Sequence, residues 1–220
     1  TYADIDRLAG NFASYLQHHT NLKPGDRFAI QLPNTLQYPV AVLGALRAGL
    51  ILVNTNPLYT EREMLHQFDD SGAKALLFID MFGHKVAKIA AQTGIQYFFS
   101  TSLADLLPAP KRWLINTGAK YIKKMIPAYS LEREIRLRDA LATGSQQAFR
   151  RLPSPKWDDV ALLQYTGGTT GIAKGAMLTN GNLISNMLQA RAALSQIDAD
   201  GNALYQPATE NVVAPLPLYH

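Results

Sequence analysis

The segment Tyr165–Gly175 reads YTGGTTGIAKG and contains the residue types that bind phosphate groups. Its glycines allow the backbone to bend tightly and to approach a ligand closely. Threonine hydroxyls and free backbone N–H groups can bind phosphate oxygens, and Lys174 adds a compact positive charge. We therefore predict a nucleotide phosphate loop here, with a flexible glycine–threonine turn between two strands as the alternative.

The spacing within this segment differs from the two most familiar phosphate-binding patterns. A Walker A sequence has Gly-Lys followed by Ser or Thr, whereas Lys174 lies between Ala173 and Gly175. A dinucleotide-binding G-x-G-x-x-G sequence separates its first two glycines, whereas Gly167 and Gly168 are adjacent. The pattern therefore indicates a phosphate site of another class.

The composition limits the classes of protein to consider. With 220 residues, of which 47% are hydrophobic and 17% charged, the chain can bury a sizeable core and is not of a disordered type. It has no cysteine, which excludes disulfides, thiolate metal sites and a cysteine nucleophile. The histidines show no metal-ligand spacing, and no G-x-S-x-G sequence supports a serine hydrolase. The longest apolar stretch, residues 38–53, is too short to span a bilayer.

Apolar runs with the period of strands alternate with runs that have the period of helices. This alternation predicts an α/β fold with mostly parallel sheets and flanking helices. We expect strands at residues 28–32, 50–53, 75–79, 95–99, 160–163, 176–178 and 211–216, and helices at residues 1–16, 37–48, 60–72, 82–92 and 182–194. Residues 1–99 form the first α/β part and residues 156–220 the part with the phosphate loop. Residues 100–155, a basic and proline-containing stretch, are interpreted as an excursion from the sheet.

Residues 111–138 contain eight Lys or Arg and two Glu, and such a charge favours an anionic partner. Within them, residues 111–126 place basic side chains on one arc of a helical wheel and apolar side chains on the other. This pattern is typical of a helix in the interface of an anionic membrane, and equally of a surface helix packed on its own domain. The basic residues alternate with Leu, Ile and Met rather than with exposed stacking aromatics, so we expect no nucleic acid partner.

Four segments occur in the order of the core motifs of adenylate-forming enzymes. They are the opening TYADIDRLAGNFASYL, the stretch LRAGLILVNTNPLYT at residues 46–60, the phosphate segment, and PLPLYH at residues 215–220. Together they cover nearly the whole chain, which therefore resembles the acyl-CoA synthetases of this superfamily, above all the long-chain fatty acid–CoA ligases of bacteria. Two positions depart from the usual phosphate motif: Gly167 stands where many members have Ser or Thr, and Ala173 where most have Pro.

The resemblance implies a reaction in two halves. A long-chain fatty acid attacks ATP to give acyl-adenylate and pyrophosphate, and coenzyme A then displaces AMP, with Mg²⁺ as cofactor. The residues implied in binding the nucleotide phosphates are Tyr165, Thr166, Gly167, Gly168, Thr169, Thr170, Gly171, Lys174 and Gly175. Thr166 would also lie near Mg²⁺, and the catalytic groups would be Lys174 and His220, the latter beside the reacting carboxylate. From the residues alone, a structural histidine at the end of a strand is the better interpretation of His220.

The resemblance also implies that residues 1–220 are the incomplete N-terminal part of the catalytic large domain. The later motifs of the family and its small C-terminal lid domain are absent from the sequence, so we expect this fragment alone to be inactive. An aryl-CoA ligase, a peptide-synthetase adenylation domain and a non-catalytic ATP- or membrane-binding module remain as alternatives. We expect a cytoplasmic location, with contact to the inner face of the cell membrane if residues 111–126 bind lipid.

Overall fold

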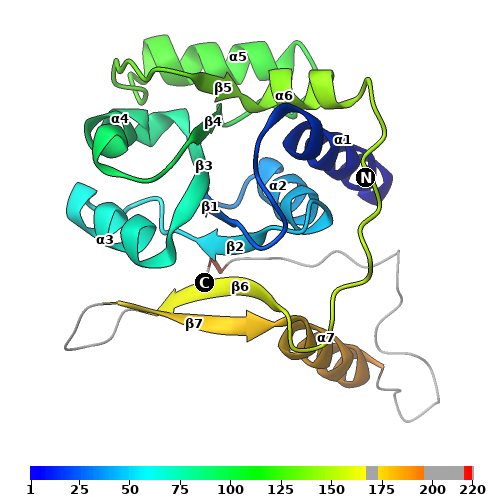
Figure 1. Ribbon diagram of the computed structural model, residues 1–220. Coiled ribbons are helices and arrows are strands. Elements are labelled where there is room, and N and C mark those ends of the chain that lie inside the picture. The colour runs from blue at the N-terminus through cyan, green and yellow to red at the C-terminus, as the bar shows by residue number, and fades with distance from the viewer. Residues whose placement is uncertain (167–172, 196–215, 220) are drawn as a thin grey trace.

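The computed structural model describes residues 1–166, 173–195 and 216–219. In these residues one seven-stranded sheet runs through the molecule in the order β5-β4-β3-β1-β2-β6-β7 (Figure 1). The strands are β1 Arg27–Gln31, β2 Ile51–Asn54, β3 Ala73–Ile79, β4 Tyr97–Thr101, β5 Glu134–Arg136, β6 Val160–Thr166 and β7 Lys174–Thr179. Neighbouring strands are parallel except for β6 and β7. The predicted α/β class with a mostly parallel sheet is therefore confirmed.

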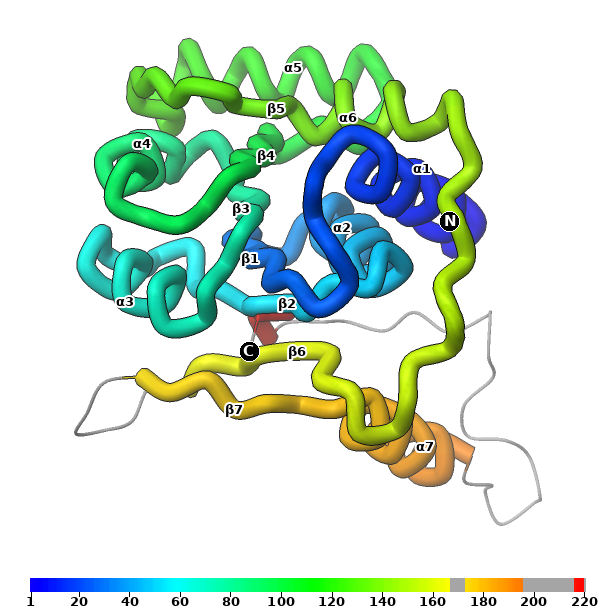
Figure 2. The backbone as a smooth tube through the Cα atoms, viewed as in Figure 1, coloured from blue at the N-terminus to red at the C-terminus, as the bar shows by residue number. Residues whose placement is uncertain are grey.

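Helices cover both faces of the parallel part of the sheet (Figures 1 and 2). One face carries α1 Tyr2–His19, α2 Gln37–Arg47 and α6 Leu137–Gly144, and the other carries α3 Glu61–Ser71 and α4 Gly83–Ile89. The remaining helical elements are η1 Asp80–Phe82, η2 Ala90–Gln92, α5 Lys111–Thr117, the π-helix η3 Gly118–Ile122, and α7 Asn180–Leu194, which follows β7. Among the described residues, no helix combines the length and the hydropathy needed to cross a membrane.

Strand residues alternate between two apolar cores, one beneath each layer of helices. In β3, Leu77 packs with residues of α1, α2 and α6, whereas its neighbours Leu76 and Phe78 pack with residues of α3 and α4. Because both sides of these strands are buried, their sequences are almost continuously apolar, as expected in a parallel sheet. Phe12 of α1 is fully buried in the core beneath α1, α2 and α6, which we call the first core.

Local sequence signals fix both ends of α3. Thr60 caps its first turn by accepting a hydrogen bond from the backbone N–H of Glu63, and the Glu63 carboxylate accepts from the backbone N–H of Thr60 in return. Gly72 ends the helix in the left-handed conformation (φ 61°), in which a side chain would be strained. The buried side chain of Gln67 donates to the backbone carbonyl of Asn54 at 2.8 Å, which ties α3 to the end of β2.

The β6–β7 pair is the exception in the described part of this mostly parallel sheet. The two strands are antiparallel, and β7 is longer than the predicted 176–178. The reason is the short connection between them, because a parallel crossover needs a dozen or more residues. Residues 211–215 of the predicted last strand lie outside the described residues, and Leu216 is not in a strand.

The stretch 100–155 also differs from its prediction. β5 pairs with β4, and α6 packs in the first core, so this stretch partly rejoins the sheet instead of leaving it. A strand of three residues is too short to leave a recognisable period in the sequence. The single helix predicted at 111–126 ends at Ile122 and changes from α to π at Gly118.

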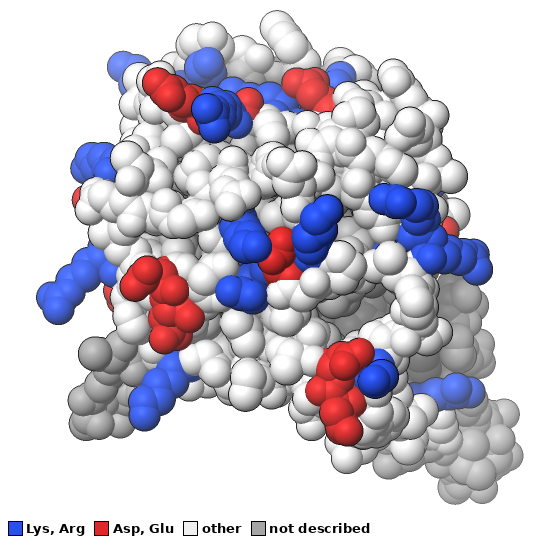
Figure 3. Space-filling view, viewed as in Figure 1, with Lys and Arg blue, Asp and Glu red and all other residues white. Residues whose placement is uncertain are grey.

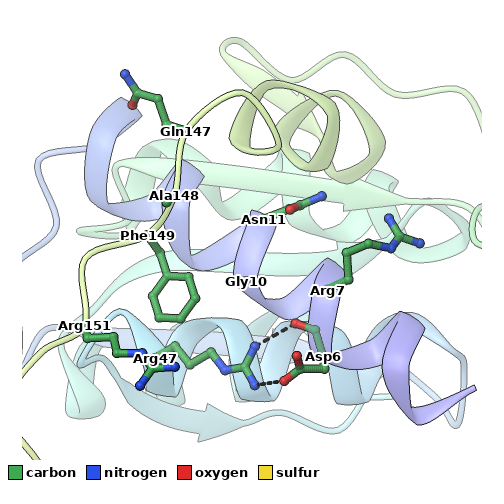
Figure 4. Close-up of a pocket in the computed structure, with 9 residues that line it drawn as sticks. All are labelled: Asp6, Arg7, Gly10, Asn11, Arg47, Gln147, Ala148, Phe149 and Arg151. Atoms are coloured by element: carbon green, nitrogen blue, oxygen red, sulfur yellow. Dashed lines mark hydrogen bonds and ion pairs between the residues drawn. The ribbon is translucent and has the colours of Figure 1, made fainter.

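Residues 145–159 carry the chain from α6 past α1 to the start of β6 (Figure 2). The side-chain amide of Gln17 bonds both the backbone N–H of Arg150 (2.8 Å) and its carbonyl (3.0 Å). Beside it, in a cavity of about 470 Å³, Arg47 binds Asp6 and lies 5.7 Å from the centroid of the Phe149 ring (Figure 4). Arg47 thus contacts both Asp6 of α1 and Phe149 of the connection. We therefore interpret the cavity as part of the packing that holds residues 145–159 in place and, through them, the start of β6.

Candidate active site

β6 and β7 bring the two ends of the phosphate segment together. Their register pairs Tyr165 with Gly175 and Thr166 with Lys174, so residues 167–173 connect the two strands. Thr166 and Lys174 are both exposed at this end of the hairpin. Within the described ranges, no carboxylate forms an ion pair with Lys174, which leaves its charge available to a ligand.

The structure therefore brings together four of the predicted site residues, Tyr165, Thr166, Lys174 and Gly175, at the base of the loop. The others lie outside the described residues: Gly167, Gly168, Thr169, Thr170, Gly171 and His220. The roles assigned to all of these residues in phosphate binding, metal binding and catalysis stay predictions.

Tyr165 supports the hairpin from the side of α3. Its side chain is 5% exposed, and its hydroxyl donates to Oδ2 of Asp70 at 2.5 Å. Burial, and then the Asp70 carboxylate, raise the pKa of Tyr165 above its ordinary value, so the hydroxyl keeps its proton and remains a donor. A Cβ atom on Gly175 would lie 2.9 Å from the Tyr165 ring, so the tyrosine requires glycine as its cross-strand partner.

Successive side chains of β6 point to opposite faces of the sheet. Leu162 packs in the core of α1 and α2, whereas Leu163 and Tyr165 pack in the core of α3 and α4. By this alternation, Gln164 and Thr166 face the side of α2. The loop base thus has one face held by α3 and another open toward the carboxyl ends of β1 and β2, where parallel sheets bind their ligands.

Residues 216–219 are held on that side by a partly buried network of polar side chains. Gln164 donates from Nε2 to the Tyr219 carbonyl at 2.9 Å, and its Oε1 accepts from Nδ2 of Asn54 at 3.0 Å. The Tyr38 hydroxyl donates to the Leu218 carbonyl at 2.7 Å and lies 2.9 Å from Oδ1 of Asn54. Burial raises the pKa of Tyr38 to about 12, so this hydroxyl also stays protonated.

Asn34 completes the attachment from the loop after β1. Its Nδ2 donates to the Leu216 carbonyl, and its Oδ1 accepts from the backbone N–H of Leu218, both at 2.8 Å. The backbone directly before His220 is therefore fixed beside the strand that leads into the phosphate segment.

The sequence interpretation missed the residues that anchor this site. Asn54 and Gln164 had a usable signal, because each is a polar residue that directly follows a run of apolar strand residues. Asp70 and His66 had none, since polar residues on an amphipathic helix are ordinary. In residues 1–166, 173–195 and 216–219, no group of three or more His, Asp or Glu could hold a metal ion.

The whole chain matches the model of one protein family, described as AMP-binding enzyme, over residues 1–220. The chain belongs to the AMP-binding enzyme family. It is 45% identical over 220 residues to a long-chain-fatty-acid–CoA ligase of Escherichia coli O157:H7, a match that covers 100% of this chain and 38% of the relative. It is 29% identical over 220 residues to 4-coumarate–CoA ligase 2 of Petroselinum crispum, with 100% of this chain and 34% of the relative covered.

Solved structures of AMP-binding enzymes share the fold. A crystal structure of a long-chain-fatty-acid–CoA ligase from Archaeoglobus fulgidus matches with a TM-score of 0.68 and 25% identity, covering 90% of this chain and 33% of that chain. The ATP-bound MatB structure from Rhodopseudomonas palustris matches with a TM-score of 0.65 and 27% identity, covering 88% of this chain and 32% of that chain. In length, the sequence spans 38% of the long-chain-fatty-acid–CoA ligase of Escherichia coli O157:H7.

Proposed function

We propose that this chain is the N-terminal part of a long-chain fatty acid–CoA ligase. The full protein would use ATP to convert a fatty acid into acyl-adenylate, and would then transfer the acyl group to coenzyme A. The 45% identity to a long-chain ligase, against 29% to a 4-coumarate ligase, supports a fatty acid over an aromatic acid as substrate.

One observation carries the proposal: the hydrogen bond from Gln164 to the Tyr219 carbonyl. Gln164 lies two residues before Thr166 and faces the same side of β6. The strand that enters the phosphate segment is therefore bonded to the backbone that leads into His220. Under this proposal, the bond would link the place for the ATP phosphates to the place for the acid that attacks them.

The first half of the reaction brings a carboxylate against a polyphosphate, so negative charge must be offset at the loop. Lys174 would supply the positive charge, and Thr166, Thr169 and Thr170 would supply hydroxyl donors. Gly167, Gly168 and Gly171 would let backbone N–H groups reach the phosphate oxygens. His220 would donate a hydrogen bond to the carboxylate of the fatty acid and orient it for attack.

Thr166 is the residue that would hold Mg²⁺. Its side chain is exposed at the loop base, where the hydroxyl oxygen could serve as one ligand. An oxygen donor of this kind fits the ion, which keeps several waters and takes few protein ligands where it binds with phosphates. When bound, the ion supplies further neutralisation of phosphate charge.

We also propose that residues 111–126 contact an anionic membrane on the cytoplasmic side. In α5 and η3 only Ala119 is buried, whereas Trp113, Leu114 and Ile122 are 69, 66 and 78% exposed. The basic side chains of this segment are Lys111, Arg112, Lys120, Lys123 and Lys124. Exposed apolar and basic groups side by side support lipid contact over packing on the domain. Elsewhere, on the face shown in Figure 3, basic and acidic side chains are interspersed, which does not favour nucleic acid.

The proposed function is tested by acid-dependent pyrophosphate release from ATP by the full-length protein. Oleate, 4-coumarate and a mixture of amino acids would be compared at equal concentration. We expect release with oleate to be fastest, followed by acyl-CoA formation when coenzyme A is added. Faster release with 4-coumarate would indicate an aryl-CoA ligase, and faster release with an amino acid would indicate a peptide-synthetase adenylation domain. No release with any acid would favour a non-catalytic binding module.

A further inference from the structure

His66 and Asp70 lie one turn apart on α3, so their side chains project from the same face of the helix. Asp70 accepts the hydrogen bond from Tyr165, on the strand that enters the phosphate segment. Nε2 of His66 lies 3.1 Å from the carbonyl oxygen of Ala173, the residue before β7. One helical turn thus contacts the chain on both sides of residues 167–172.

Each contact has a defined direction. The Ala173 carbonyl can only accept, so the His66 ring must carry a proton on Nε2 to bond it. The Tyr165 hydroxyl is protonated, so Asp70 serves as acceptor. A change that removes the donor at position 66 or the acceptor at position 70 therefore breaks one bond and leaves the other in place.

α3 is itself held rigidly enough to act as a fixed support. Its capping box and Gly72 define its ends, and Gln67, between the two contact residues, bonds the end of β2. Lys88 of α4 also pairs with Glu61 at 2.8 Å. In contrast, no residue of β7 is fully buried, so packing alone does little to fix the second side of the loop.

We propose that His66 and Asp70 are positioning residues that hold the two sides of the phosphate loop at the spacing required for ATP. The inference rests on the proposed function, because it assigns the loop to ATP phosphates. Neither residue needs to touch the nucleotide. Their effect passes through the backbone of Tyr165 and Ala173 to residues 166–174, where a small displacement is costly for phosphate contacts.

The test measures KM for ATP, KM for oleate and kcat for pyrophosphate release in the full-length protein. Asp70→Ala and His66→Leu should each raise KM for ATP about tenfold, the size of one lost hydrogen bond, and leave KM for oleate within about twofold. Asp70→Asn keeps an acceptor and His66→Gln keeps an N–H donor, so both should restore KM for ATP. Asp69→Ala, on the neighbouring exposed residue, is the matched control and should behave as the parent.

A double substitution tests whether Asp70 acts through Tyr165. In a Tyr165→Phe background the hydroxyl is already gone, so Asp70→Ala should change KM for ATP no further. Thermal unfolding of each variant separates a positioning effect from loss of the fold, and the Asn and Gln variants retain the test if the Ala or Leu variants fail to fold. Unchanged KM for ATP in Asp70→Ala and His66→Leu, or equal increases in both KM values, would overturn the inference. Absence of oleate-dependent pyrophosphate release in the parent would instead contradict the proposed function.

Discussion

The parallel part of the sheet and the β6–β7 hairpin with α7 are stabilised in different ways. In the parallel part, helices cover both faces, and Phe12, Phe28 and Phe99 are fully buried with ring centroids 5.5 to 5.9 Å apart. In the hairpin and α7, by contrast, Met177 and Met187 are both 69% exposed. On the predicted apolar face of α7, Leu183 is partly buried, whereas Met187 and Ala190 are exposed in the described part of the chain.

The region that carries the phosphate loop therefore depends on a few directional contacts at one edge of the hairpin. Tyr165 bonds α3, and Gln164 bonds Asn54 and the segment before His220. Hydrogen bonds fix an orientation within tenths of an ångström, whereas apolar burial is non-directional. We expect the rest of the full-length protein to cover the open face of α7 and leave the loop base as it is.

The largest expected effect is on stability in the parallel part. Phe12→Ala removes a ring from the centre of the first core and should lower the free energy of unfolding of residues 1–220 by about 3–5 kcal/mol. Met187→Ala, on the exposed face of α7, should change it by less than about 0.5 kcal/mol. Urea unfolding of both variants measures the difference. Equal losses of unfolding free energy would mean that Met187 of α7 is packed, and would contradict the contrast drawn between the parallel part and α7.

The next effect concerns the two exposed apolar surfaces, which differ in charge. The surface at 111–126 has five cations, whereas α7 has Arg191 alone. Replacing Lys120, Lys123 and Lys124 with Glu should remove at least about 3 kcal/mol of attraction, or roughly 100-fold in partition to anionic vesicles at low salt. The control, Met187→Ser with Leu188→Ser, should sediment with vesicles as the parent does. Equal sedimentation of the triple variant and the parent at every salt concentration would show that residues 111–126 do not bind lipid.

A smaller effect is expected at the network before His220. Gln164→Leu removes both the bond to Asn54 and the bond to Tyr219 and should slow oleate-dependent pyrophosphate release by roughly 10- to 100-fold. Stability should fall by about 1–3 kcal/mol, since Asn54 and the Tyr219 carbonyl lose a partner. Gln96→Leu, at an exposed position, is the control and should change neither quantity. A Gln164→Leu enzyme with parental activity would contradict the role given to the network.

The sequence predicted what depends on residue type and local spacing. Capping at Thr60 and the apolar runs of β1 to β4 placed those elements within one or two residues, because each signal lies within a few positions of the element it defines. The glycine–threonine composition of Tyr165–Gly175 marked the loop for the same reason. The short β5 and the change from α to π helix at Gly118 left no such local signal.

The anchors of the loop could not be predicted because their partners are distant in the chain. Tyr165 and Asp70 are separated by 95 positions, and Asn54 and Gln164 by 110. Only the sheet order, in which β6 pairs with β2 after the three intervening strands β3, β4 and β5 and their helices, brings these side chains together. A polar residue at the end of a buried strand is a hint of such a contact, but it does not name the partner.

The measurement that tests the central claim most directly is pyrophosphate release from ATP and oleate by the full-length protein with Lys174→Ala. Lys174 is the single Lys or Arg in Tyr165–Gly175, and it lies opposite Thr166 at the loop base. Its loss should slow release by roughly 10- to 1000-fold, the range for one electrostatic contact to the reacting groups. Lys156→Ala, near the other end of β6, should leave the rate unchanged. Parental turnover of Lys174→Ala at saturating ATP would contradict the assignment of this hairpin to the phosphates of ATP.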